Sequence, residues 1–570
     1  MSSKSFVSSI PTDVFAVHGA DPEILAFAMA KYSRSALSMR ESLREISSQR
    51  AEQFLNTFYF QYGHRSIADL AHIAFAIERL SLLAALVLVD EQRWDGQERS
   101  TRYQDFLKSG WFSPDFGEDR ASAKLYAETI EGLYAAYSRT TAAVLEVLRL
   151  RVARPEEMKP EAYERTLRAR AFDVARYLLP LATNTSLGQI VSARTLETQV
   201  SRLLSHPAAE IRSLGARLRD AATGPAWNVN AQTAQAFVDK VAALERQGAG
   251  NREQGTENRD QRSLDSALKG HDFGRAERTD QHGGPFAPEE SLAAEAAGLL
   301  TREVRTAPTL VKYAQPNPYQ VETCRELAQA AAELLINHPI APAPLVDLVE
   351  RTETLEVELA ATLLYSASHH PYRQIRDIAA ALSAAQVEEI IEIGLRHRGR
   401  HDEALRAFHA GAALRFDLLM DIGGFRDMHR HRRCTQIIQG FTAAHGYELP
   451  GAGDLPAGID ILAEAGILND FCSTIEAAHR AAQRIAAGSA PEAAESALYV
   501  LPLATRVRSL FKMDFAEAQY IAELRSAPAG HFSYRRVAWE MFLAIQRQYP
   551  ALARHIRVTD FTQPIDMLKR

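Results

Sequence analysis

Cysteine is scarce in this chain of 570 residues: only Cys324, Cys434 and Cys472 occur, far apart and without a CxxC pair. Disulfide frameworks and zinc sites need cysteines in closely spaced sets, so the sequence predicts neither. Few cysteines also fit a protein that folds in a reducing compartment. We therefore expect a cytoplasmic protein that holds no metal ion.

Long apolar segments are missing as well. The longest one, "LSLLAALVLV" from Leu80 to Val89, has about half of the ~20 residues that a membrane-spanning helix needs. The N-terminal residues contain no apolar run of the kind found in secretory signals. The sequence thus predicts a protein with no membrane partner.

An excess of positive charge is also missing, because 71 acidic residues outnumber the 65 lysines and arginines. Nucleic-acid-binding proteins normally carry a basic domain or patch, so we expect no nucleic-acid partner. Against this background the stretch "FRDMHRHRRCTQ", Phe425 to Gln436, contains four arginines and two histidines. Such a run is either a helix C-terminus, where cations complement the helix dipole, or a local site for an anionic ligand.

Helical periodicity dominates the rest of the chain. Ala, Leu, Glu and Arg recur at three- and four-residue spacing in residues 122–150, 160–177 and 386–395. Strand-like segments are shorter, and the clearest are residues 74–77 and 413–419. The sequence therefore predicts a fold of helices and a few strands.

A polar segment divides the chain. Residues 245–284 are rich in Gly, Gln and charged residues and nearly free of large apolar side chains, so they cannot bury enough surface to offset their ordering entropy. We predict an N-terminal lobe at residues 1–244, a disordered linker at 245–290 and a C-terminal lobe at 291–570.

The two parts look like copies of one another. The pentapeptide "LPLAT" occurs at Leu179–Thr183 and again at Leu501–Thr505, and each copy is followed after a similar interval by an arginine, Arg202 or Arg525. Upstream, each part has a strand-like segment that leads into a charged loop, and these loops lie 340 residues apart. The sequence therefore predicts an internal duplication.

The charged loops resemble the signature RHRxxSxNExSxRY of the flavin-dependent thymidylate synthase family. In the first loop, Asp90 to Tyr103, the RHR positions hold Asp90, Glu91 and Gln92, whereas the later part keeps Glu98, Ser100, Arg102 and Tyr103. The segment before it, "YGHRSIADLAHIAFAIERLS", resembles the family's GHxS motif and the strand that follows.

The second loop shows the opposite losses. Arg430, His431 and Arg432 are intact, but the later signature positions read Ile438, Gly440 and Thr442. The segments "ARYLLPLATNT" and "SARTLETQVSRLLSH" resemble the family's later ligand-binding parts and supply Arg176, Arg194, Arg202 and His206. The second copy has Leu498 in place of Arg176 and Ala516 near the place of Arg194, but keeps Arg525.

In the family, the active site combines the RHR part and the late arginine of one subunit with the ExSxR part and the arginine before LPL of its neighbour. The complementary losses therefore predict one composite site per chain. The second site would face Asp90 and Glu91 toward Gly440, Thr442 and Leu498, and we expect it to be inactive.

The resemblance implies a role for each residue of the composite site. Arg430 and Arg525 would act catalytically by polarising a pyrimidine ring, because cations placed where charge develops are usually the largest catalytic contribution. Hydroxyl and guanidinium groups suit a nucleotide phosphate. The expected substrate-binding set is Glu98, Ser100, Arg102, Arg176 and Arg430, and the expected cofactor-binding set is Ser66, Arg194, His206, Arg430, His431 and Arg432.

The fold implied by the resemblance is α/β, of the α+β kind: two tandem lobes, each a mostly antiparallel sheet packed by long helices. The implied activity is reductive methylation of dUMP to dTMP, with FAD as cofactor and NADPH and methylenetetrahydrofolate as co-substrates. The implied assembly is a homodimer with four lobes. Two alternatives stay open: the same chemistry on another pyrimidine nucleotide, and an inactive regulator or scaffold that binds nucleotide or flavin.

Simpler interpretations exist for several of these residues. Glu98 and Arg102 have the i, i+4 spacing of a surface ion pair on a helix. Ser100 could cap a turn, and Arg194 and Arg202 could face solvent on a helix. His64, His72, His206 and His531 could be buried, hydrogen-bonded histidines.

Overall fold

The protein is described by a computed structural model. It describes residues 20–31, 67–253, 292–300, 303–311, 314–350, 352–399, 402, 405–408, 414–450, 460–553 and 556–568. The chain divides into two compact units: residues 1–21 with 221–308, and residues 22–220 with 309–570. The larger unit contains both predicted sheets and both LPLAT segments.

The N-terminal lobe is built on a three-stranded antiparallel sheet. Its strands are β1 (His72–Ser81), β2 (Asp95–Glu98) and β3 (Asn184–Ser192), in the order β1-β3-β2. The register pairs His72 with Ser192, and a bulge follows Glu78 where Arg79 has a φ of 60°. The strand predicted at 74–77 is confirmed as the middle of β1.

Helices cover this sheet. Ser81 caps α4 (Leu82–Leu88), and the long helix predicted from residue 122 is α5 (Arg120–Arg151). Then follow α6 (Pro160–Ala175), the short η3 (Arg176–Leu178), α7 (Ala193–Leu204) and α8 (Ala209–Thr223), while α1 (Pro22–Lys31) precedes the sheet.

The C-terminal lobe repeats this plan with one strand more. Its strands are β4 (Val346–Leu348), β5 (Leu414–Asp421), β6 (Thr435–Ile438) and β7 (Arg506–Met513), in the antiparallel order β4-β5-β7-β6. The helices of the repeated plan are α16 (Ile422–Met428), α18 (Leu468–Ala486), α19 (Ala493–Leu498), α20 (Phe515–Ser526) and α21 (Phe532–Gln548). Short elements complete it: η4 (Arg406–Phe408), η5 (Ala443–His445), α17 (Ile461–Glu464) and α22 (Pro550–Ala553).

Element boundaries support the predicted duplication. The pairs α4 and α16, and β2 and β6, begin and end 340 residues apart, and the pair α7 and α20 begins and ends 322 residues apart. The charged loops are also 340 residues apart, and the LPLAT segments are 322 residues apart. The predicted α+β fold of two tandem lobes is confirmed.

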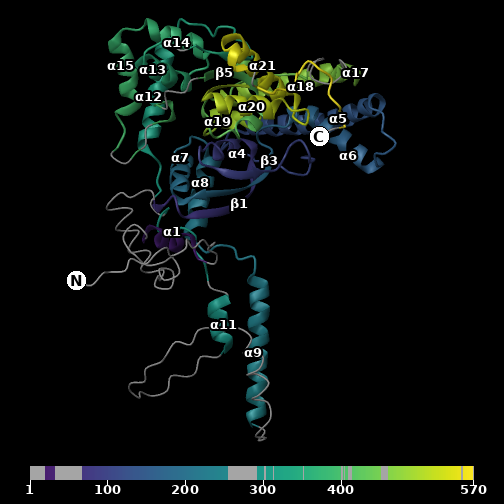
Figure 1. The fold of residues 1–570 in the computed structure, drawn as a ribbon, viewed down its shortest axis with the longest axis vertical. Helices are drawn as coiled ribbons and strands as arrows, with labels where there is room; N and C mark the ends of the chain where they lie inside the picture. The colour runs from purple at the N-terminus through teal and green to yellow at the C-terminus, as the bar shows by residue number, and fades with distance from the viewer. Residues whose placement is uncertain are drawn as a thin grey trace, which may run out of the picture. The chain divides into compact units, whose positions relative to one another are not determined.

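Four further helices belong to the C-terminal lobe: α12 (Pro318–Leu335), α13 (Leu355–Ser366), α14 (Tyr372–Ala381) and α15 (Ala384–Leu395). They form a group beside β5 in Figure 1 and share a buried apolar cluster with Ile437 of β6 and Leu510 of β7. The helix predicted at 386–395 is confirmed as part of α15.

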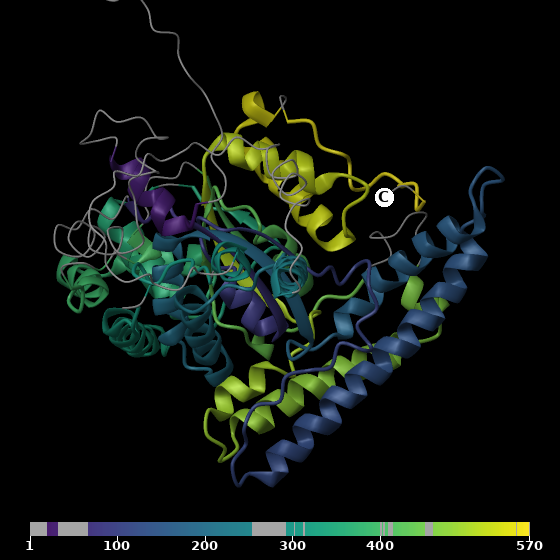
Figure 2. The ribbon, with the colours of Figure 1, turned by 90° about the horizontal axis from the view of Figure 1, so that it is seen from below.

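The two LPLAT segments join the lobes. Pro180 and Pro502 form an antiparallel bridge, the Leu181 N–H donates to Leu501 O, and the Leu503 N–H donates to Leu179 O, both at 2.9 Å. Helix α18 lies along α5 (Figure 2), and one apolar core contains buried residues of both lobes. Because each segment hydrogen-bonds its own copy, the lobes are related by an approximate two-fold axis.

The smaller unit contains α9 (Ala231–Glu253) and α11 (Leu292–Leu300), which pack against each other. The sequence placed residues 245–253 in the disordered linker, but they are helical. Extending a formed helix adds one hydrogen bond for each residue fixed and avoids the cost of nucleation, so α9 continues into polar sequence. Residues 254–290 lie outside the described part, and the predicted lobe boundaries stay predictions.

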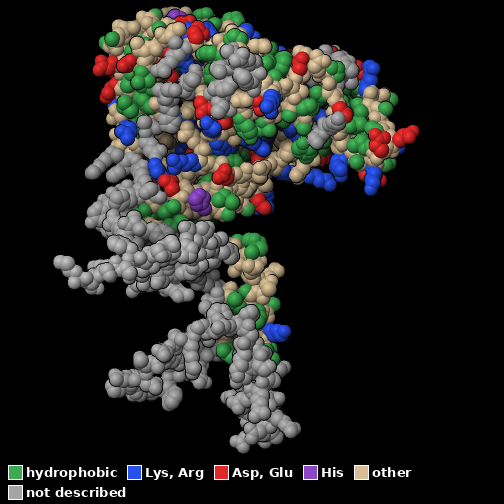
Figure 3. Space-filling model, in the orientation of Figure 1, with side chains coloured by type: hydrophobic (Ala, Val, Ile, Leu, Met, Phe, Trp, Pro, Cys, Tyr) green, Lys and Arg blue, Asp and Glu red, His purple; other side chains and the backbone are tan. Residues whose placement is uncertain are grey.

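The described surface mixes charges of both signs. On the face shown in Figure 3, lysines and arginines alternate with acidic side chains over the larger unit. Within the described ranges, no helix has the length and apolar composition needed to cross a bilayer, and no three potential metal ligands gather.

Candidate active site

The basic stretch begins where α16 ends. Asp421 starts this helix by accepting a hydrogen bond from the Gly424 N–H at 2.6 Å, and His429 is its C-terminal cap. Arg430 to Arg433 follow directly, so the cations do lie at a helix C-terminus, as the simpler interpretation expected. A solvated helix end does not explain two of their contacts: His431 accepts from Arg525, and Arg432 donates to backbone carbonyl groups of the other lobe.

His431 joins the basic loop to α20. The Arg525 Nε–H donates to His431 Nε2 at 2.8 Å, and His431 Nδ1 lies 3.4 Å from Glu517 Oε1. A ring nitrogen that accepts carries no proton, so this geometry assigns the proton to Nδ1 and makes the ring neutral. Burial lowers the pKa of His431, in agreement with this form. The charge of Arg525 is therefore not neutralised by His431.

Arg102 extends from the N-terminal lobe into the C-terminal lobe. Its Nε donates to Asp173 at 2.7 Å, and its Nη1 donates to the Tyr534 hydroxyl of α21 at 2.9 Å. The guanidinium groups of Arg102 and Arg525 lie 5.7 and 5.4 Å from the centre of the Tyr534 ring. The ring of Tyr534 is therefore in contact with one arginine from each lobe.

Arg176 meets α16 in the same region. Its Nη1 lies 3.3 Å from Asp427 Oδ2, across the lobe interface. Burial raises the pKa of Asp427, but Arg176, Arg102, Arg430 and Arg525 together lower it to about 2. The structure therefore places Arg176 against Asp427, and the charges of Arg102, Arg430 and Arg525 lie near enough to act on this carboxylate.

Glu98 and Ser100 lie on the same side of the interface. Glu98, on β2, forms a short ion pair with Arg426 of α16, and both side chains are nearly buried. The Ser100 hydroxyl accepts from the Arg102 N–H at 3.2 Å. Glu98 pairs with Arg426 and Arg102 pairs with Asp173, and Glu98 belongs to a strand rather than to the helix on which an i, i+4 pair would form.

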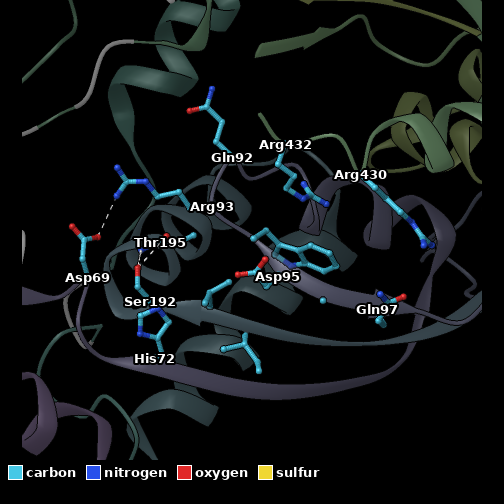
Figure 4. A pocket seen from close by; sticks show the side chains of 14 residues that line it. Asp69, His72, Gln92, Arg93, Asp95, Gln97, Ser192, Thr195, Arg430 and Arg432 are labelled. Atoms are coloured by element: carbon cyan, nitrogen blue, oxygen red, sulfur yellow. Dashed lines mark hydrogen bonds and ion pairs between the residues drawn. The ribbon is translucent and has the colours of Figure 1, made fainter. Parts of the chain in front are cut away.

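A pocket of 710 Å³ opens beside this cluster (Figure 4). The loop and strand Gln92–Gln97, the end of β3 with Ser192, and Thr195 of α7 line it from the N-terminal lobe. Arg430 and Arg432 line it from the C-terminal lobe. The pocket is thus composite, like the arginine cluster.

Arg432 is the less exposed of these two cations. Its guanidinium lies 4.5 Å from the centre of the Trp94 ring, and its Nη1 donates to the carbonyl oxygens of Val89 and Glu91. Burial lowers the pKa of Arg432 to about 10, even though Asp90 and Glu91 oppose this. A half-buried cation whose donors meet carbonyl groups favours a further anion nearby.

Arg430 and Arg432 line the pocket, but three other predicted cofactor residues with described positions, Arg194, His206 and His431, do not. Arg194 lies next to it, with its Nη1 3.2 Å from Asp69, which does line the pocket. His206 accepts from the Ala208 N–H at 3.1 Å, and burial lowers its pKa to about 4. Ser66 and His64 lie outside the described residues.

Two histidines differ from one another in their surroundings. His72 was expected to be buried, but it is exposed at the start of β1 and lines the pocket. His531 is fully buried, caps α21 and donates from Nε2 to Asp173 O at 2.8 Å. It therefore has a structural role, as the simpler interpretation held.

A comparison with protein families identifies this architecture. The sequence model of the family described as "Thymidylate synthase complementing protein" matches residues 15–224 and, separately, residues 345–551. The chain belongs to this family. The two matched segments coincide with the two sheets, so the chain is a tandem arrangement of thymidylate synthase complementing protein lobes.

Similar proteins include both double-length and single-length members. A "UPF0159 protein" of Chlamydia muridarum is 25% identical over 98% of this chain and 94% of its own. A "Flavin-dependent thymidylate synthase" of Clostridium tetani is 27% identical over 31% of this chain and 67% of its own. A solved structure of flavin-dependent thymidylate synthase ThyX from Helicobacter pylori, complexed with FAD and dUMP, is 17% identical, covers 35% of this chain and 89% of that one, and has a TM-score of 0.24.

The loop of the first lobe differs from its counterpart in this tandem family member. Glu91, at the position of His431, accepts from Arg202 Nη2 at 2.7 Å and Nε at 3.0 Å. Asp90, at the position of Arg430, accepts from Arg406 of η4 at 2.5 Å. Burial raises the pKa of Asp90, but Arg406, His429 and Arg202 more than offset this and hold it below its ordinary value. Each acidic side chain here neutralises a nearby arginine.

The space that corresponds to the 710 Å³ pocket is filled in the C-terminal lobe. Where the pocket has Ile190, β7 has Lys512, a buried side chain whose Nζ donates to Glu358 and Thr362 of α13 at 3.0 and 2.9 Å. Ile437, in place of Gln97, is buried in the cluster with α12–α15. The added helices therefore occupy the place of a second pocket.

Several residues of the site were not predicted from the sequence. Asp427 and Arg426 lie within the quoted basic stretch, and an acidic residue among so many cations was a signal that could have identified Asp427. Asp173, Tyr534 and Arg406 carry no comparable signal. Their distance along the chain from their partners makes them visible only in the folded structure.

Proposed function

We propose that this protein is a flavin-dependent thymidylate synthase-like methyltransferase that converts dUMP to dTMP with methylenetetrahydrofolate and NADPH. One observation carries the proposal: Arg102 of one lobe and Arg525 of the other lie 5.7 and 5.4 Å from the centre of the Tyr534 ring, and Arg176 contacts Asp427 in the basic stretch that also contains Arg430. Family membership supports the reaction class. In the counterpart region, the carboxylates of Asp90 and Glu91 pair with Arg406 and Arg202.

Substrate binding follows from the donor set. Ser100, Arg102 and Arg176 would hold the 5′-phosphate. Arg176 would donate from Nε and Nη2 in charge-assisted hydrogen bonds, whereas Arg102, which already pairs with Asp173, would contribute its positive charge. Arg430 and Arg525 would face the pyrimidine ring and stabilise the negative charge that develops on it. Because neutral His431 accepts from Arg525, it fixes the direction of this arginine without cancelling its charge.

The residues present also fit FAD. The composite pocket has 710 Å³, within the usual range of ligand pockets, and two arginines face it. Arg432 is half-buried with carbonyl partners and so favours an anionic group. Arg430, Arg432, Ser192 and Thr195 would hold the cofactor. When bound, the flavin would supply the reducing equivalents and the route for the one-carbon unit.

Purified protein tests this proposal directly. We expect it to bind flavin, to bleach with NADPH, and to form dTMP from dUMP and methylenetetrahydrofolate. The same chain should rescue a bacterial strain that requires thymidine. Turnover of UMP or dCMP instead of dUMP would move the proposal to another pyrimidine nucleotide, and flavin or nucleotide binding without turnover would indicate a regulator or scaffold.

A further inference from the structure

Arg176 is buried but only partly hydrogen-bonded. Its side chain is 2% exposed, and its Nη1 lies 3.3 Å from Asp427. Its Nε and Nη2 have no hydrogen-bond partner among the described residues. Leaving donors of a buried guanidinium unpaired is costly, so their presence indicates a place where a ligand supplies the acceptors.

Asp427 is more accessible than the arginine it contacts. Its side chain is 18% exposed, whereas that of Arg176 is 2% exposed. Residue 427 lies in the last turn of α16, and the corresponding position of α4 holds Val87. The carboxylate is therefore a feature of the composite site alone.

Most other charges of the cluster already have partners. Arg102 pairs with Asp173 at 2.7 Å, and Arg426 pairs with Glu98. Asp421 also lies near Arg176, but Gly424 and Ser533 donate to its two oxygens. The Arg525 guanidinium donates to a neutral imidazole. Asp427 is thus the accessible carboxylate facing Arg176, Arg430 and Arg525.

We propose that Asp427 is the built-in counter-ion of the phosphate subsite, which neutralises Arg176 in the empty site and is displaced from it by the phosphate of the nucleotide. This inference rests on the proposed function, because that function assigns the phosphate to Arg102 and Arg176. Phosphate oxygens would then complete the hydrogen bonds of Arg176 Nε and Nη2. Asp427 would weaken the binding of substrate and product equally and so assist product release.

The test is nucleotide binding by the full-length protein and by Asp427→Asn, which keeps the shape of the side chain and removes its charge. We expect the Kd for dUMP to fall about tenfold and the Kd for inorganic phosphate to fall as well, because an internal competitor is lost. Deoxyuridine, which lacks the phosphate, should bind equally to both proteins. Asp470→Asn, which removes an exposed carboxylate paired with Arg139, is the matched control and should change each Kd less than twofold.

A structure of the wild-type protein with dUMP gives a second readout that needs no variant. The contact between Asp427 and Arg176 should be broken, with phosphate oxygens on Arg176. An intact contact in that complex, or an unchanged or weaker dUMP affinity of Asp427→Asn, would overturn the counter-ion role while leaving the proposed function in place. Absence of dUMP and phosphate binding in both proteins would instead remove the proposed function and the counter-ion with it.

Discussion

The two lobes start from the same plan and end with different sites at their contact. Where the composite site has Arg430 and His431, its counterpart has Asp90 and Glu91. The late arginine of each lobe contacts the loop of the same lobe, but Arg525 meets a neutral imidazole whereas Arg202 meets a carboxylate. One site keeps its positive charge, and the other cancels it internally.

The same contrast extends to the space around each site. The N-terminal lobe leaves a pocket of 710 Å³ beside β2 and β3. In the C-terminal lobe, Lys512 and Ile437 take the corresponding positions and are buried under α13. A duplicated chain needs only one working site, so the other can be used for packing. The two regions therefore differ in packing as well as in their cations.

A third difference lies at the start of the helix after the first long strand of each lobe. Ser81 caps α4 and donates to Glu210 of α8 at 2.7 Å, whereas Asp421 caps α16 and accepts from Ser533 of α21. The carboxylate and the hydroxyl have exchanged places between the two elements. Each arrangement satisfies both groups, so the contact is kept in both lobes although the residue types are exchanged.

The largest expected effect comes from removing an arginine of the composite site. Arg430→Ala and Arg102→Ala should each lower kcat/KM for dUMP by on the order of 10²–10³ or more, since each removes a charge aimed at the substrate. The double variant should be little worse than either single one, because residues that act together are not additive. Formation of dTMP by purified protein is the measurement.

Arg433→Ala is the matched control for these variants, because Arg433 belongs to the same basic run but is exposed and pairs with Asp514. It should retain nearly full activity. Nearly full activity of Arg430→Ala or Arg102→Ala, in contrast, would show that the site is not shared between the lobes.

In the counterpart site around Asp90 and Glu91, removing a charged side chain should lower stability but leave activity unchanged. Asp90→Asn should reduce the free energy of unfolding by about 2–3 kcal/mol, because it leaves Arg406 partly buried without its charged partner. Urea denaturation measures this, and activity per folded molecule should stay constant. Asp470→Asn, at an exposed ion pair, should cost less than about 0.5 kcal/mol. Loss of activity in folded Asp90→Asn would mean that this loop still serves catalysis.

The exchanged pair predicts that stability depends on pH, because burial raises the pKa of the carboxyl group in each lobe, Glu210 and Asp421. Burial raises the pKa of Asp421 to about 6, so the folded protein holds this proton more tightly than the unfolded chain does. Its stabilising contribution is present below about pH 4 and is lost as the pH rises through 6, by up to about 2–3 kcal/mol. Asp421→Asn cannot titrate but can still cap α16.

Urea denaturation of both proteins between pH 4 and pH 7.5 measures the effect. The wild type should lose stability relative to Asp421→Asn as the pH increases over this range. A difference between the two proteins that stays constant with pH would show that Asp421 is ionised throughout.

The smallest effect should come from the segment between α9 and α11. If residues 254–290 only raise the effective concentration of the two lobes, replacing them with a short flexible span should leave activity unchanged. Either half alone should be inactive, because each lacks the arginines of the other, and co-expressed halves should regain activity. Turnover by the isolated C-terminal half would contradict a shared site.

Local sequence was sufficient to predict the repeated elements and the complementary loops. The LPLAT segments and the basic run of Arg430 to Arg433 are contiguous in sequence, so they could be aligned without a structure. The contact between Arg102 and Tyr534, 432 residues apart, could not be found in this way. The exchange of the Ser81–Glu210 pair for the Asp421–Ser533 pair could not be found from local sequence either. The two residues of each pair lie on different helices or helix caps that meet only after folding.

The filled counterpart was the least predictable part. The acidic charges of Asp90 and Glu91 indicated that this loop would repel an anion. The resemblance led us to expect that the two residues face Gly440, Thr442 and Leu498. It did not indicate that Arg406 and Lys512 would enter the region, since both residues gain their partners only when α13 and η4 pack on the sheet. Tertiary packing, not local pattern, decides whether a lost site stays open or closes.

Flavin stoichiometry tests the central claim most directly. After saturation with FAD and desalting, the flavin absorbance of denatured protein is compared with the concentration of the chain. One open composite pocket and one filled counterpart predict one FAD per chain of 570 residues. A ratio near two would show that the Asp90 and Glu91 site still binds cofactor and would contradict the difference between the lobes on which the account rests.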